Sequence, residues 1–94
     1  MISKLLQLKK YSNPDIVAHK AHQLGLNPIY ESTRKDKKYM ISDGHKIIHF
    51  GQIGYEDYTK HNDEKRRNNF IIRNHRWAHQ PKYSAGWLSY NLLW

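Results

Sequence analysis

The sequence predicts a small α+β domain, in which an antiparallel hairpin lies between N-terminal and C-terminal helices. Asp43-Gly44 separates two apolar runs, and this is a strong hairpin signal because the turn needs a positive φ. Apolar residues recur at helical spacing after Asn13-Pro14. The chain has three Trp, seven Tyr and two Phe, an aromatic content typical of a folded chain rather than a disordered one. We therefore expect one domain over residues 1–94 with a modest core.

The first predicted helix begins at Asn13-Pro14. Asn13 can accept hydrogen bonds from the free N–H groups of the first turn, and Pro14 is tolerated at the first helical position. Gly25 fits the C-terminal stop, because glycine readily adopts the left-handed conformation found there. Four apolar residues between these signals share the spacing of one helix face: Ile16, Val17, Ala21 and Leu24.

Two strands of the hairpin are predicted at residues 38–41 and 46–50, and residues 28–32 can supply a third. A hairpin alone is marginally stable in water, so we expect a helix to pack against one of its faces. Gly51 and Gly54 follow the second strand, and we assign them to turns. Their spacing is too short for a nucleotide-binding loop, which needs more glycines and a lysine at set positions.

A long basic helix is predicted over residues 63–77. Thr59 or Asn62 can cap its N-terminus. Asp63 and Glu64 lie in its first turn, where the helix dipole favours acidic side chains. One side of this helix combines apolar and cationic residues, namely Phe70, Arg73 and Trp77.

The end of the chain is aromatic and carries no charged side chain over residues 83–94. Ser84 can cap a short final helix in this segment. Such a segment either closes the core of its own domain or docks on another protein, and we favour the core interpretation. We expect the strands to pack on five bulky residues from the last two helices: Phe70, Ile71, Trp77, Trp87 and Trp94.

The formal net charge is +8, and the cations are concentrated in the middle of the chain. A basic middle indicates an anionic partner, with nucleic acid as the first choice and an acidic protein surface as the second. The absence of Cys excludes disulfides, thiolate zinc sites and a cysteine nucleophile. No apolar run reaches the ~20 residues of a membrane span, and residues 1–10 lack the features of a signal peptide. We therefore expect no membrane span.

The predicted basic helix holds the densest group of cations, and arginine forks can bind either phosphate oxygens or carboxylates. Tyr55 and Tyr58 precede this helix and can stack on nucleic-acid bases. The alternative is a solvated helix face, in which the cations pair with nearby acids such as Glu56, Asp57 and Asp63. The candidate residues for an anionic partner are Lys65, Arg66, Arg67, Arg73 and Arg76, together with Lys37 and Lys38.

Histidines and two acids form a second candidate group: His45, His49, His61, His75 and His79, with Asp57 and Asp63. Such a set can hold a divalent metal or supply a general base. The string Arg73-Asn74-His75 invites comparison with His-Asn-His nucleases, but one short string does not show the strand–helix frame of those sites. We interpret the histidines as structural, and we expect no metal, no cofactor and no catalytic residue.

An ordered series of short strings runs through the chain: Lys38-Tyr39, His49-Phe50-Gly51, Asp57-Tyr58-Thr59-Lys60-His61, Asp63-Glu64-Lys65-Arg66-Arg67 and Leu88-Ser89…Leu92-Leu93-Trp94. With this series the chain resembles a family of small basic proteins encoded by large double-stranded DNA viruses and some phages. The resemblance covers about residues 30–94, and residues 1–29 are more divergent. It implies a viral origin and a structural or genome-associated role, without a reaction to transfer.

From this resemblance we expect a non-enzymatic viral structural protein, a minor capsid or capsid-associated component of the virion that bridges larger proteins. Its expected partners are other virion or capsid proteins and double-stranded DNA, and its expected location is the virion and the interior of the infected cell. The first alternative is a nucleic-acid-binding protein that contacts phosphates through the helix at residues 63–77. The second is a metal-dependent nuclease that uses His49, Asp57, His61 or His75.

Overall fold

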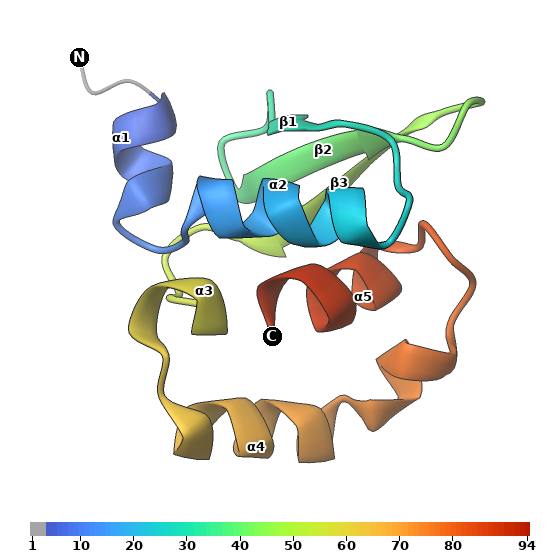
Figure 1. The fold of residues 1–94 in the computed structure, drawn as a ribbon. Coiled ribbons are helices and arrows are strands. Elements are labelled where there is room, and N and C mark those ends of the chain that lie inside the picture. The colour runs from blue at the N-terminus through green and yellow to red at the C-terminus, as the bar shows by residue number, and fades with distance from the viewer. Residues whose placement is uncertain (1–3) are drawn as a thin grey trace.

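A three-stranded antiparallel sheet carries helices on one of its faces, as Figure 1 shows for the computed structural model, which describes residues 4–94. The strands lie in the order β1 (Ile29–Glu31), β2 (Lys37–Ser42) and β3 (Ile47–Gln52). The α+β class is therefore confirmed. The helical elements are α1 (Lys4–Lys9), α2 (Pro14–Gln23), α3 (Tyr58–His61), α4 (Glu64–Arg73), η1 (His75–His79), α5 (Ala85–Leu88) and η2 (Ser89–Leu93).

The predicted hairpin is confirmed, and its turn is built on Asp43. The Asp43 carboxylate accepts hydrogen bonds from the backbone N–H groups of His45 and Lys46, both at 2.8 Å. Gly44 adopts a φ of +98°, which the Asp-Gly signal requires. The third strand is also confirmed, because β1 pairs with β2 in the register that places Ile29 opposite Ile41.

The predicted N-terminal helix is α2, and its end signals act as expected. The side chain of Asn13 accepts a hydrogen bond from the backbone N–H of Ile16, and Gly25 follows the helix with a φ of +70°. The structure adds α1, which the sequence analysis did not predict. Leu8 of α1 is fully buried, and the Lys4 ammonium donates to the backbone carbonyls of Arg34, between β1 and β2, and of Lys37, at the start of β2.

The basic helix is shorter than predicted, because α4 ends at Arg73 and the chain continues as the 3₁₀ helix η1. Asn74 leaves the helical conformation, and its side-chain amide donates to the Phe70 carbonyl at 3.0 Å, an alternative to regular helix that Asn commonly offers. The N-terminal cap is Asp63, whose carboxylate accepts from two backbone N–H groups, rather than Thr59 or Asn62.

The core joins the sheet to α1, α2 and the C-terminal segment, by which we mean α5, η2 and Trp94. Its buried apolar residues are Leu8, Val17, Ala21, Tyr39, Ile41, Phe50, Leu88, Leu92 and Leu93. The prediction that the uncharged end closes the core is thus confirmed. Trp87 and Trp94 pack at the edge of this core, as expected. The prediction was wrong for Phe70, Ile71 and Trp77, which lie outside it because α4 does not reach the sheet.

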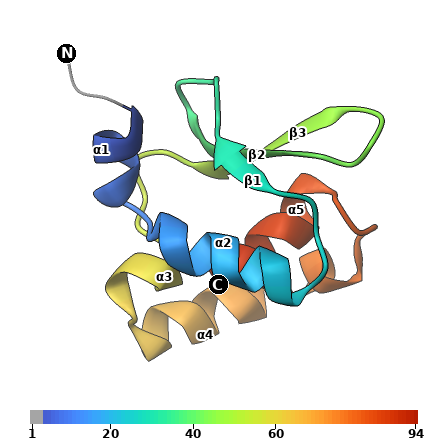
Figure 2. The ribbon, with the colours of Figure 1, turned by 45° about the horizontal axis from the view of Figure 1, so that its top comes forward.

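Helix α4 lies on the side of the molecule away from the sheet, with the C-terminal segment between them (Figure 1 and Figure 2). No residue of α4 is buried. The helix is attached through Phe70, whose ring stacks on Trp94 with 4.3 Å between centroids and 7° between planes. Arg67 adds a hydrogen bond of 2.8 Å from its Nε to the Trp94 carbonyl. Within residues 4–94, no helix has the length and apolar character that crossing a membrane requires.

A buried ion pair between Lys38 and Asp57 ties β2 to the segment that follows β3. The Lys38 Nζ lies 3.1 Å from Asp57 Oδ2, and the two side chains are only 3% and 1% exposed. The ammonium also donates to the carbonyls of Tyr55 at 2.6 Å and Tyr11 at 3.4 Å. Burial lowers the pKa of Lys38, and the charge of Asp57 opposes this effect.

The polar network extends from this ion pair to the connection between α1 and α2. Thr59 donates from its hydroxyl to the other oxygen of Asp57, and the same hydroxyl accepts from the Asn13 backbone N–H at 2.9 Å. The Tyr39 hydroxyl donates to Ser12 Oγ at 2.7 Å, and burial raises the pKa of Tyr39. Every one of these polar groups has a partner, which is the condition for burying them without a large loss of stability.

We predict that Lys38→Met lowers the free energy of unfolding by about 3–5 kcal/mol, because Asp57 would stay buried without its counter-charge. Urea unfolding followed by tryptophan fluorescence measures this change. Lys35→Met, at an exposed position, is the control. The double variant Lys38→Met/Asp57→Asn should lose less than the sum of the two single variants, and strict additivity would contradict the pairing.

We predict that Gly51→Ala destabilises the fold more than Gly25→Ala. Both glycines have positive φ, +80° and +70°, which a Cβ disfavours by about 1–2 kcal/mol. A Cβ at Gly51 would also lie 3.0 Å from a Leu93 methyl and 3.1 Å from the Lys38 Cβ, whereas Gly25 faces open space. The crowding should add about 1–3 kcal/mol at Gly51. Equal urea midpoints for the two variants would show that the core absorbs the methyl group.

Candidate functional site

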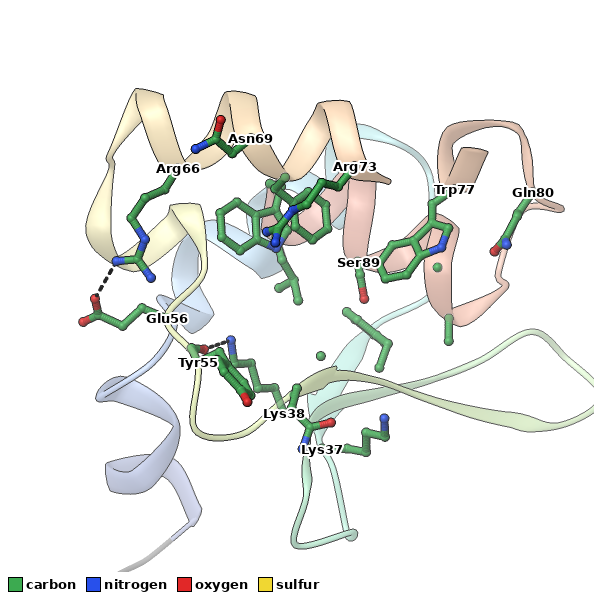
Figure 3. A pocket seen from close by; sticks show the side chains of 18 of the residues that line it. Lys37, Lys38, Tyr55, Glu56, Arg66, Asn69, Arg73, Trp77, Gln80 and Ser89 are labelled. Carbon is green, nitrogen blue, oxygen red and sulfur yellow. Dashed lines mark hydrogen bonds and ion pairs between the residues drawn. The ribbon is translucent and has the colours of Figure 1, made fainter. Parts of the chain in front are cut away.

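A groove with a volume of about 910 Å³ separates α4 from the end of the sheet (Figure 3). Helix α4 and η1 form one wall, and β2, β3 and the loop at Tyr55 and Glu56 form the other. The C-terminal segment lines the groove between these two walls. This volume falls within the range of small-molecule sites, about 300–1,000 Å³. The groove exists because α4 contacts the C-terminal segment and leaves the sheet uncovered beside it.

Aromatic side chains line the groove from several parts of the chain. Trp77 projects into it from η1, and its ring meets Phe70 edge-on at 5.7 Å between centroids. The stacked pair of Phe70 and Trp94 lines it below α4. Tyr55 stands on the opposite wall and is 71% exposed, although its carbonyl is fixed by Lys38. The groove therefore offers flat apolar surfaces on both walls.

The charged groups that line the groove are mostly cations. Arg66 and Arg73 extend from α4, and Lys37 lies on the opposite wall. The acid in the lining is Glu56, which pairs with Arg66 at 3.5 Å, and both of these side chains are about half exposed. Exposed pairs of this kind are weak, so solvent and ligands can compete for Arg66. Arg73 makes no side-chain hydrogen bond or ion pair with another described residue.

Three of the predicted binding residues are engaged inside the protein. The Lys38 ammonium is buried in the ion pair with Asp57, although its stem lines the groove. Arg67 bonds the Trp94 carbonyl and lies over the Tyr58 ring at 5.2 Å from its centroid. The Tyr58 hydroxyl donates to Glu64, and this hydrogen bond raises the pKa of Tyr58. The Lys38 ammonium, the Arg67 guanidinium and the Tyr58 hydroxyl therefore each have a partner within the fold.

The other predicted residues divide between the groove and the outer surface. Arg66, Arg73, Lys37 and Tyr55 line the groove, as described above. Lys65 and Arg76 are exposed on α4 and η1 but do not line it. Asn69, an amide interleaved with the cations of the predicted basic helix, also lines the groove, and three further lining residues had no predicted binding role, namely Trp77, Gln80 and Ser89. The shared helix side of Phe70, Arg73 and Trp77 was the signal that could have indicated Trp77.

The residues proposed for a nuclease do not gather in one place. His49 Nδ1 lies 2.7 Å from Ser32 Oγ, Asp57 pairs with Lys38, and His75 is exposed at the start of η1. In residues 4–94, no group of three or more His, Cys, Asp and Glu side chains is close enough to hold a metal ion.

His61 has a structural environment at the junction of α3 and α4. Its Nδ1 accepts a hydrogen bond of 2.9 Å from the Asp63 backbone N–H, and its ring lies 5.2 Å from the Trp94 ring. Its Nε2 is buried without a hydrogen-bond partner among the described residues. Burial, and then the nearby charge of Arg66, lowers the pKa of His61 below its usual value of 6.5.

We predict that the free energy of unfolding falls as the pH decreases from about 7.5 to about 5. The reason is that His61 binds a proton at a higher pH in the unfolded chain than in the folded protein, so acid favours the unfolded state. His61→Gln should make this decrease smaller. The contribution of His49, whose pKa is also lowered by burial, should remain. Urea unfolding at several pH values measures the effect, with the exposed residue His45 changed to Gln as the control. An unchanged pH dependence in His61→Gln would contradict this account.

The comparisons with known proteins identify one family. No curated protein matches the chain, and no solved structure does. A family model described as a family of unknown function (DUF5754) matches residues 28–74, which is half of the chain. The matched segment runs from the start of the sheet to the end of α4 and includes the Lys38–Asp57 pair. The chain therefore belongs to the family of unknown function DUF5754.

Proposed function

We propose that the protein is a non-enzymatic nucleic-acid-binding protein that contacts phosphates through the surface of α4 and η1. The observation that carries this proposal is the group of exposed cations along these two elements, which have at most a weak partner among residues 4–94: Lys65, Arg66, Arg73 and Arg76. Exposed cations that are unpaired or only weakly paired attract a polyanion and release its counterions on binding.

The form of the surface supports phosphate as the ligand. Three of the four cations are arginines, whose planar forks match phosphate oxygens. Lys37 lies across the groove from them, so that a strand in the groove would meet positive charge on both walls. The two acids at the start of α4 are engaged locally, since Asp63 accepts from two backbone N–H groups and Glu64 accepts from the Tyr58 hydroxyl. The net charge of +8 adds long-range attraction for any polyanion.

A second candidate function is that of a minor capsid or capsid-associated protein in a virion. The resemblance to small basic viral proteins motivates it, and the outer face of the sheet favours it. By the strand register, Tyr30, Met40 and Ile47 share the face opposite Tyr39, and Tyr30 and Ile47 are 60% and 54% exposed. Such a face can be buried against a larger protein. Mass spectrometry of purified particles, before and after nuclease treatment, tests this candidate.

We predict that the protein binds a fluorescent DNA oligonucleotide and that the affinity falls steeply with salt, because phosphate contacts dominate. Arg66→Ala/Arg73→Ala should weaken binding and lower the slope of log K against log salt by about 2, one for each lost contact. Fluorescence anisotropy at several salt concentrations measures both quantities.

The control variant for this experiment is Lys10→Ala/Lys46→Ala, which removes two exposed cations that do not line the groove. It should leave the affinity within about twofold of the native value, because these charges act only at long range. If both double variants weaken binding equally, the affinity depends on net charge and not on the α4 surface. No binding at low salt would contradict the proposal.

A further inference from the structure

We infer that the groove takes an unpaired nucleobase, so that the protein prefers single-stranded nucleic acid over a duplex. This inference rests on the proposed function and deepens it by naming the form of the ligand. It starts from the aromatic side chains, which phosphate binding alone does not require. Trp77, Tyr55 and the stacked pair of Phe70 and Trp94 all line the groove, from four different parts of the chain.

The position of Trp77 is set by a glycine. A Cβ on Gly86 would lie 3.0 Å from Trp77 Cγ and would also collide with the Gln80 side chain. The indole therefore rests close to the backbone of α5, while it lines the groove as well. Phe70 meets it edge-on and limits its rotation. A ring held in this way presents a stacking surface at a small loss of conformational entropy, which favours binding.

A base must leave a duplex to use this surface. In a duplex both faces of each base are covered by neighbouring base pairs, so only the edges and the backbone are accessible. The groove has the volume of a site for a small molecule, about 910 Å³, and α4 closes one side of it. A single strand can turn one base into this space, where stacking on aromatic rings is tolerant of sequence.

Charged and polar groups around the rings fit the rest of a nucleotide. Arg73 and Arg66 lie along the α4 wall, and Lys37 lies on the other, where they can hold the phosphates on either side of the base. Two amides, Asn69 and Gln80, also line the groove. An amide both donates and accepts hydrogen bonds, so it can pair with the edge of any base. Aromatic surfaces combined with a cationic track are the pattern of single-strand binding sites.

The experiment compares three fluorescent probes of equal length by anisotropy: a single strand, the duplex of the same sequence, and an abasic strand that keeps every phosphate. The single strand is tested both as DNA and as RNA, and tight binding of either one supports the inference. We expect at least one single strand to bind about tenfold more tightly than the abasic strand and more tightly than the duplex, because only the unpaired bases reach the rings.

Matched tyrosine variants test the site itself. Tyr55→Ala removes a groove residue that is 71% exposed, and Tyr30→Ala removes a tyrosine on the outer face of the sheet that is 60% exposed. Tyr55→Ala should weaken single-strand binding severalfold and leave abasic binding unchanged, whereas Tyr30→Ala should change neither. Trp77→Ala should act in the same direction with a larger effect, with its thermal unfolding recorded to confirm that it remains folded.

The outcomes separate this inference from the proposed function. If the abasic strand or the duplex binds as tightly as both single strands, the groove does not take a base, although phosphate binding stands. If Tyr55→Ala and a folded Trp77→Ala both bind the single strands like the native protein, the inference is likewise wrong. If none of the probes binds at low salt, the proposed function and this inference both fail.

Discussion

The buried ion pair of Lys38 and Asp57 is the constraint on which the rest of the structure depends. Two charges removed from water must remain together, because separating them inside the protein would leave each without compensation. The pair joins β2 to the segment after β3, and the same ammonium fixes the Tyr55 carbonyl. The interaction that organises the interior therefore also positions one wall of the groove.

The groove results from a core that is too small to cover every element. The C-terminal segment fills the space against the sheet with Leu88, Leu92 and Leu93, which are almost completely buried. Helix α4 has no buried residue and is attached through Phe70 and Arg67 to the end of this segment. A helix attached in this way gains little from burial, and most of its outward side chains remain exposed to solvent. The cations and aromatic rings that α4 and η1 contribute to the groove therefore lie outside the buried core.

Local sequence signals predicted the elements that local hydrogen bonds define. Asp43-Gly44 makes its turn with neighbouring N–H groups, and Ser84 accepts from the Trp87 N–H to begin α5. The predictions of helices were wrong or incomplete where a distant contact or a single side chain decides whether a helix forms or where it ends. Helix α1 depends on the burial of Leu8 and on contacts of Lys4 more than 30 positions away, as in its bond to the Lys37 carbonyl. The basic helix ends early because Asn74 bonds to Phe70.

The sequence by itself determined the fold class, the positive charge, the hairpin and the uncharged segment that completes the core. It also identified the cations from which a site for a polyanion was proposed, but it did not show which of them have partners within the fold. Only the tertiary structure decided that Lys38 and Arg67 bond within the fold, because their partners lie 19 and 27 positions away along the chain. The same packing left Arg73 beside Trp77 in the groove. Composition fixes how many charges a chain carries, whereas burial decides which of them remain available to a partner.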